Sequence, residues 1–234
     1  MGAFDDRATG AALAEFLAPD FTVFTYARRA RVDGGDTPPD AVERKFAVLD
    51  ALIGATGGSA AVFGFSSGAI LALHTATHGS AIGKLALYDA PFDVDAGHAR
   101  PRVDHASNLA APIAEGRRGD AVEYCQLEVV GPPAEVVAQV RHAPFRPALE
   151  RMAHTLVYEA TILGGGPLPI GLAASVRVRT VVIDGGDFGH ASMRRAVQTL
   201  AAALPHGRHL GLEEQQHQIV PATIGPPRRA FFTN

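Results

Sequence analysis

The segment Gly64-Phe65-Ser66-Ser67-Gly68 restricts the possible folds of this chain more than any other feature of its sequence. It joins an apolar run, Ala60–Gly64, to a second apolar stretch of helical composition that begins at once after Ser66. A serine at G-x-S-x-G spacing between a strand and a helix indicates a sharp, strained turn, and the two glycines leave room for the crossing chain segments. A plain surface turn would require neither the strand before it nor the helix after it. The segment therefore predicts a nucleophile elbow with Ser66 at its tip.

The rest of the chain fits a mostly parallel α/β sheet with helices on both faces, because runs rich in β-forming residues alternate with Ala- and Leu-rich helical stretches. The expected strands are Phe21–Tyr26, Ala60–Gly64, Lys84–Tyr88, Val178–Ile183 and His209–Leu212. The expected helices are Ala8–Leu17, Asp40–Ala55, Ser67–His78, Ala191–Leu204 and a last one after Pro221.

A stretch of consecutive helical segments interrupts this alternation. Gly-Pro and Ala-Pro signals separate the expected helices Asp120–Val130, Pro133–Val140 and Ala148–Leu163, and Gly164–Pro167 is expected to be a flexible return into the next strand. We therefore expect an N-terminal part of the core at residues 1–100, a helical cap insertion at 101–168 and a C-terminal part of the core at 169–234.

Composition excludes several classes of function. The chain has 234 residues, 47% of them hydrophobic, which suits one globular domain with a buried site. A net charge of −3 without clustered Lys and Arg argues against nucleic acid and membrane surfaces as partners. The lone Cys125 excludes an internal disulfide and is expected to be buried as a small apolar residue.

Location and cofactors follow from the same kind of argument. The first residues lack a secretion signal and no apolar run is long enough to cross a bilayer, so a cytoplasmic location is expected. No His, Cys or Asp cluster has metal-ligand spacing, so neither a metal nor an organic cofactor is implied.

A serine nucleophile needs a base within hydrogen-bond reach and a carboxylate to orient that base. His217 follows the last expected strand, where the third member of a triad falls in the chain order Ser, acid, His. The acid is open between Asp89, directly after the strand Lys84–Tyr88, and Asp187, just beyond the strand Val178–Ile183. Asp184 continues the strand Val178–Ile183 and is assigned a structural role.

Several segments together resemble the α/β-hydrolase superfamily over nearly the whole chain. They are Tyr26–Arg29, Asp33–Pro39, Gly64–Gly68, Leu85–Phe92 and Leu212–His217. The sequence is particularly similar to small actinobacterial hydrolases that share an "ALY-acid-x-PF" segment. The resemblance implies an α/β-hydrolase fold with a Ser-His-acid triad, and it favours Asp89 as the acid because those relatives carry a carboxylate at that position.

The sequence departs from the family at three places. Relatives carry further strands and an oxyanion loop before the first helix, whereas this chain opens at about the end of that loop, so the usual first strands are expected to be missing. The oxyanion donors would then be the backbone N–H of Ser67 and that of Ala3 or Phe4. In addition, Ala27 and Ala30–Val32 replace a characteristic turn, and Phe65 replaces a frequent histidine.

These features predict a serine hydrolase that cleaves a small, largely apolar carboxylic ester through Ser66, His217 and Asp89. One alternative is a thioesterase or acyltransferase of the same fold. Another is a catalytically impaired, shortened hydrolase that acts as a binding protein. A sheet edge left open by missing strands would favour a homodimer.

Overall fold

A single parallel sheet organises the protein. The computed structural model describes residues 1–31, 35–36, 41–92, 94, 103–164, 168–186 and 191–233. Within these residues the sheet has four strands in the order β1-β2-β3-β4, and all neighbours run parallel. The strands are β1 (Ala60–Phe65), β2 (Ile82–Tyr88), β3 (Arg179–Gly186) and β4 (Gly207–Gln215). The structure therefore confirms the α/β class and four of the expected strands.

The remaining expected strand, Phe21–Tyr26, is wrong. The segment has neither helical nor ladder structure, and no described strand pairs with it. Val23 and Phe24, in the middle of the run, are exposed, whereas Phe21 and Tyr26 at its ends pack against the core clusters. A β-rich composition produces a strand only where a neighbouring strand supplies hydrogen bonds and a packed face. Such a partner is missing among the described strands, in which β1 and β4 are the two edge strands.

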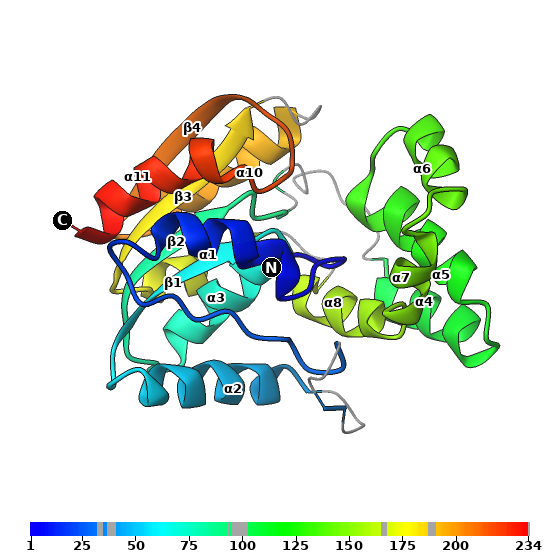
Figure 1. The fold of residues 1–234 in the computed structure, drawn as a ribbon, viewed down its shortest axis with the longest axis horizontal. Coiled ribbons are helices and arrows are strands. Elements are labelled where there is room, and N and C mark those ends of the chain that lie inside the picture. The colour runs from blue at the N-terminus through cyan, green and yellow to red at the C-terminus, as the bar shows by residue number, and fades with distance from the viewer. Residues whose placement is uncertain are drawn as a thin grey trace.

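Helices cover both faces of the sheet (Figure 1). A short 3₁₀ turn, η1 (Ala8–Gly10), leads into α1 (Ala11–Leu17), which packs with α11 (Pro221–Thr233) on one face. The other face is covered by α2 (Val42–Ala55), α3 (Ser67–Thr77), α9 (Ile170–Ser175) and α10 (Ala191–Ala203). The helices expected from the sequence on either side of the cap are confirmed, with ends that differ by a few residues.

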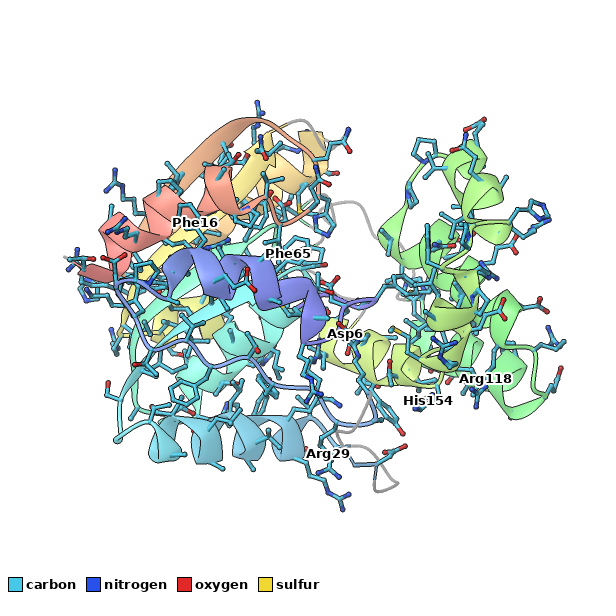
Figure 2. The ribbon with its side chains drawn as sticks, viewed as in Figure 1. Asp6, Phe16, Arg29, Phe65, Arg118 and His154 are labelled. Carbon is cyan, nitrogen blue, oxygen red and sulfur yellow. The ribbon has the colours of Figure 1, made fainter. Side chains whose placement is uncertain are left out.

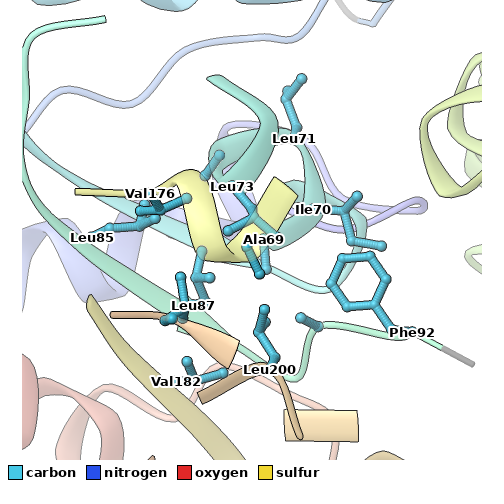
Figure 3. Packing of buried hydrophobic residues seen from close by; sticks show 14 of the residues in the cluster. Ala69, Ile70, Leu71, Leu73, Leu85, Leu87, Phe92, Val176, Val182 and Leu200 are labelled. Carbon is cyan, nitrogen blue, oxygen red and sulfur yellow. The ribbon is translucent and has the colours of Figure 1, made fainter. Parts of the chain in front are cut away.

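The core explains why α3 is held firmly against the sheet. Strand residues alternate between the faces, so that Leu85 and Leu87 pack on the α3 side and Ala86 and Tyr88 on the α1 side. Figure 3 shows apolar residues of α3 converging with Leu87, Val182 and Leu200. Burial of one such side chain contributes about 1.5–3 kcal/mol. The N-terminus of α3, where Ser66 lies, is therefore anchored by the largest hydrophobic cluster.

A group of helices comes between β2 and α9 in the chain. In space, the group lies at the end of the molecule where β1 finishes at Phe65 (Figures 1 and 2). The elements of the group are α4 (His105–Ala114), α5 (Arg118–Tyr124), the π-helical η2 (Cys125–Val130), α6 (Ala134–Arg141), α7 (Arg146–Arg151) and α8 (Thr155–Leu163). α8 contacts both α4 and α3 and so connects the group to the sheet. Two expected helices are each divided, because Asp120–Val130 forms parts of α5 and η2, and Ala148–Leu163 is broken between α7 and α8.

The limits 101–168 of the expected cap stay a prediction, since residues 101–102 and 165–167, including most of the expected return Gly164–Pro167, lie outside the described residues. In the described parts of the chain, no helix has the length and apolar character that a membrane span would need.

Candidate active site

The turn between β1 and α3 has the strained geometry expected from its sequence. Ser66 has φ 54° and ψ −128°, a conformation that L-residues rarely adopt. A Cβ at position 64 would lie 2.5 Å from both the Cα of Ala69 and the carbonyl oxygen of Gly68, so only glycine fits there. The turn therefore presents Ser66 at the carboxyl end of β1 and forces a glycine at the close crossing.

The register of the sheet brings two predicted residues, Ser66 and Asp89, to one edge. Phe65 lies opposite Tyr88 in the ladder, so Ser66 and Asp89 both directly follow their strands. The N–H of Ser66 donates to the carbonyl oxygen of Tyr88 at 2.9 Å, and the N–H of Asp89 donates to that of Ile183 at 2.9 Å. Ligand sites of parallel sheets form at this edge.

His217 is oriented by Asp89. The Nδ1 atom of His217 lies 2.9 Å from Oδ2 of Asp89, whose side chain is almost fully buried. The other carboxylate oxygen of Asp89 accepts the N–H of Gly185 at 3.0 Å. The imidazole also packs on Phe65, with ring centroids 4.6 Å apart. These contacts fix the ring, and Ser66 and His217 line the same cavity.

Of the other aspartates considered in the sequence, Asp184 lies away from the cavity. Asp187 is outside the described residues. Asp184, on β3, contacts the Nε2 atom of His209 at 2.5 Å and the Nε atom of Arg194 at 3.5 Å. This second His–Asp pair ties β3 to β4 and α10 and does not line the cavity with Ser66, which agrees with a structural role for Asp184.

Two of the three expected oxyanion donors border the cavity. Ala3 and Ser67 line it together with Ser66. Phe4 is not among the lining residues, although both Ala3 and Phe4 pack against the hydrophobic cluster of α4, α5, η2 and α8. A Cβ at position 2 would lie 3.1 Å from Cβ of Ser66, so the N-terminal loop passes directly beside the nucleophile candidate. Among the described residues, the N–H groups of Ala3 and Ser67 donate to no intramolecular acceptor.

The cavity has a volume of about 210 Å³ and lies between the sheet edge and the helical group. Its polar side chains are Ser66, Ser67, His105, Glu159 and His217. Apolar residues form most of the remaining wall, namely Ala3, Pro91, Leu109, Val129, Val130, Leu156, Ala160, Leu163 and Met193. Cys125 also lines it, and burial, followed by the charge of Glu159, raises the pKa of its thiol to about 12.

Sequence reasoning missed a buried cluster of charged residues next to Ser66. Glu159 of α8 forms ion pairs with Arg28 at 2.8 Å and Arg31 at 2.9 Å. Burial raises the pKa of Glu159, but the two guanidinium groups and a hydrogen bond from Ser67 outweigh it, so the net pKa lies below its usual value of 4.5. Glu159 is the only charged residue of Thr155–Leu163, and a lone charge in an apolar helix was the available signal.

The structure offers no ready metal site in the parts of the chain that it describes, where no group of three or more His, Cys, Asp or Glu side chains is placed to hold an ion.

Comparison with known proteins finds similarity among solved structures. An α/β hydrolase from Sphaerobacter thermophilus is 46% identical, with a TM-score of 0.91 over 99% of this chain and 90% of that one. More distant is the α/β hydrolase MGS-M2 from a deep-sea metagenome, with a TM-score of 0.71 and 14% identity over 100% and 87% of the two chains. An esterase from Thermogutta terrifontis has a TM-score of 0.60 and 21% identity over 97% and 84%. No protein-family model and no curated protein matches the sequence.

Proposed function

The chain belongs to the α/β-hydrolase superfamily, and from this premise we propose that it is a serine hydrolase that cleaves a small, largely apolar carboxylic ester. The observation that carries the proposal is the 2.9 Å contact between His217 and Asp89, beside a cavity that Ser66 and His217 share. A buried carboxylate on Nδ1 keeps the proton on that nitrogen and leaves Nε2 to act as a base.

In the proposed reaction, the Oγ atom of Ser66 attacks the ester carbonyl carbon and His217 takes the serine proton. The tetrahedral intermediate collapses when His217 returns that proton to the leaving alcohol, which gives an acyl-serine. Water then attacks the acyl carbon, His217 accepts a proton from it, and the acid leaves as Ser66 regains its proton. Asp89 stays ionised and stabilises the imidazolium that forms in each half of the reaction.

Charge that develops on the carbonyl oxygen needs donors in fixed positions. Ser67, at the start of α3, and Ala3 both line the cavity, and their N–H groups are the donors in this proposal. The positive end of the α3 dipole adds to their effect. Phe4 does not line the cavity, so it is not included as a donor.

The cavity supports a small, apolar substrate. A volume of about 210 Å³ with mostly apolar walls suits an acyl or alcohol group of a few carbons. Leu109, Cys125, Leu156 and Leu163 come from α4, η2 and α8. We therefore propose that these helices act as a cap that selects the substrate, while the sheet edge carries the reacting groups.

Fluorophosphonate labelling tests the nucleophile directly. We expect intact-mass spectrometry to find one covalent adduct on the wild type and none on Ser66→Ala. p-Nitrophenyl esters of increasing acyl length should be hydrolysed, with the highest kcat/KM at acetate to butyrate. Folded wild-type protein that is neither labelled nor active would overturn the proposal.

A matched pair of histidine variants separates a catalytic role from a structural one. His217→Ala should lower kcat by about 10³-fold or more, because the serine loses its base. His209→Ala removes another histidine that contacts an aspartate, on β4 and outside the cavity, and should change kcat less than about threefold. Equal losses in both variants would contradict the assigned role of His217.

A further inference from the structure

Glu159 connects three parts of the protein through one carboxylate. It lies on α8, while its partners Arg28 and Arg31 follow α1 and Ser67 begins α3. Its Oε2 atom accepts the hydroxyl of Ser67 at 2.5 Å and a guanidinium N–H of Arg28 at 3.0 Å. All four side chains are buried. A buried carboxylate with this many charge-assisted contacts is held in one geometry.

The two arginines extend the cluster to the N-terminal loop. Nη1 of Arg31 donates to the carbonyl oxygens of Gly2 at 2.8 Å and Asp5 at 2.5 Å, and its Nη2 donates to that of Ala3 at 2.7 Å. Nη1 of Arg28 donates to the carbonyl oxygen of Met1 at 3.1 Å. A loop with little regular structure of its own is thereby fixed along its backbone by two buried side chains.

These carbonyl contacts determine where the loop N–H groups point. The carbonyl of Gly2 and the N–H of Ala3 belong to one planar peptide unit, so holding the carbonyl also orients the N–H. On the other side of Ser66, the hydroxyl of Ser67 is bound to Glu159, and its backbone N–H belongs to the same residue. Both proposed oxyanion donors are therefore attached to the same cluster.

We propose that Glu159 is the positioning residue of the oxyanion hole, which it aligns through Ser67 on one side and through Arg31 and the Gly2–Ala3 peptide on the other. The inference rests on the proposed hydrolase function, and it adds a role for the cap helix α8. Glu159 does not touch the reacting atoms. It fixes the groups that do, and a misplacement of about 1 Å in such groups can cost about 10²-fold in rate.

The first test compares Glu159→Gln with the wild type on p-nitrophenyl butyrate. The amide keeps the shape of the side chain but removes its charge, so the two arginines lose their common anchor. We expect kcat to fall by about 10- to 100-fold with KM changed less than threefold. The affinity for an alkyl boronic acid, which forms a tetrahedral serine adduct, should fall in parallel with kcat/KM. The affinity for the product acid should change less than threefold.

Ser67→Ala keeps the inference testable where Glu159→Gln fails to fold. It removes the hydroxyl that binds Glu159 but retains the backbone N–H, and kcat should fall by about tenfold with the same loss of boronic acid affinity. The double variant should lose less than the product of the two single effects, because both act on one cluster.

Glu150→Gln is the matched control. It breaks a glutamate–arginine pair of the same helical group, Glu150 with Arg146 at 2.7 Å, and neither residue lines the cavity. Its kcat and boronic acid affinity should equal those of the wild type. If the wild type is active and folded Ser67→Ala keeps its kcat, as does Glu159→Gln where it folds, this inference is overturned while the proposed function stands. A wild type that neither reacts with fluorophosphonate nor hydrolyses esters would overturn the proposed function and this inference with it.

Discussion

The Nδ1 atom of His217 and the Oδ2 atom of Asp89 lie 2.9 Å apart although the two residues are 128 positions apart in the chain. Asp89 directly follows β2, and His217 comes two residues after β4. Two parallel ladders connect these strands through β3, so the contact depends on the register of the whole sheet. Asp89 itself has a positive φ of 47°, a second strained residue next to Ser66. Strain at both positions is typical of functional sites.

Asp89→Asn should lower kcat for p-nitrophenyl butyrate by about 10³- to 10⁴-fold, because an amide neither fixes the required tautomer of His217 nor stabilises its charged form. Steady-state kinetics measures this loss, and a circular dichroism spectrum identical to that of the wild type shows that the variant is folded. Asp184→Asn is the control, since Asp184 pairs with His209 on the neighbouring strand, and kcat should change less than threefold. Nearly full activity in Asp89→Asn would point to another acid.

Gly64→Ala should destabilise the protein by about 1–3 kcal/mol or more, because the new Cβ would meet backbone atoms of Gly68 and Ala69 that cannot move independently of α3. Gly54→Ala is the matched control on α2, where an added Cβ meets nothing within 4 Å. Loss of glycine flexibility in a helix should make that variant about 0.5–1 kcal/mol more stable. Urea unfolding measures the stability of both variants. Equal free energies of unfolding would contradict the close contact of position 64 with the backbone of Gly68 and Ala69.

Local patterns predicted the elements that carry the site. The apolar run before Asp89 is a mostly buried strand, and the run before Ser66 is an edge strand whose last two residues are buried. Short apolar runs of this kind are recognisable without knowing their neighbours. Because parallel strands end at one edge, residues placed after strands could be expected to meet there. The contact of Asp89 with His217 follows from this rule, while the choice between Asp89 and Asp187 needed the resemblance to a family.

Two features could not be predicted because they depend on distant partners. Phe21–Tyr26 has a β-rich composition, yet it has no neighbouring strand in the described structure. The cluster of Glu159, Arg28 and Ser67 joins residues up to 131 positions apart, and nothing local in the sequence relates them. The short basic group at Arg28–Arg31 gave no sign that it is buried, since most arginines are exposed.

Acid should weaken the Glu159 cluster. The folded-state pKa of Glu159 lies below the usual 4.5, so its ionised form stabilises the protein fully above about pH 5, and this contribution is lost as the pH falls through the lowered value. Glu159→Gln has no such group. The difference in Tm between wild type and Glu159→Gln should therefore shrink below pH 4.5. Thermal melts from pH 3 to pH 7 check this, and a difference that widens in acid would contradict the lowered pKa.

Arg228 of α11 is fully buried, and its guanidinium lies 3.4 Å from the ring centroid of Phe63. Its three guanidinium nitrogens reach no hydrogen-bond acceptor in the described structure, and burial lowers its pKa to about 9. The contact with Phe63 offsets only part of the cost of burying a charge. Arg228→Met, which keeps the length and the packing, should therefore raise the free energy of unfolding by about 1 kcal/mol in urea titrations. Arg229→Met is the control on the same helix. It removes an exposed pair with Asp20 and should lower that free energy by less than about 1 kcal/mol. A loss of stability in Arg228→Met larger than in Arg229→Met would show that the buried guanidinium stabilises the fold.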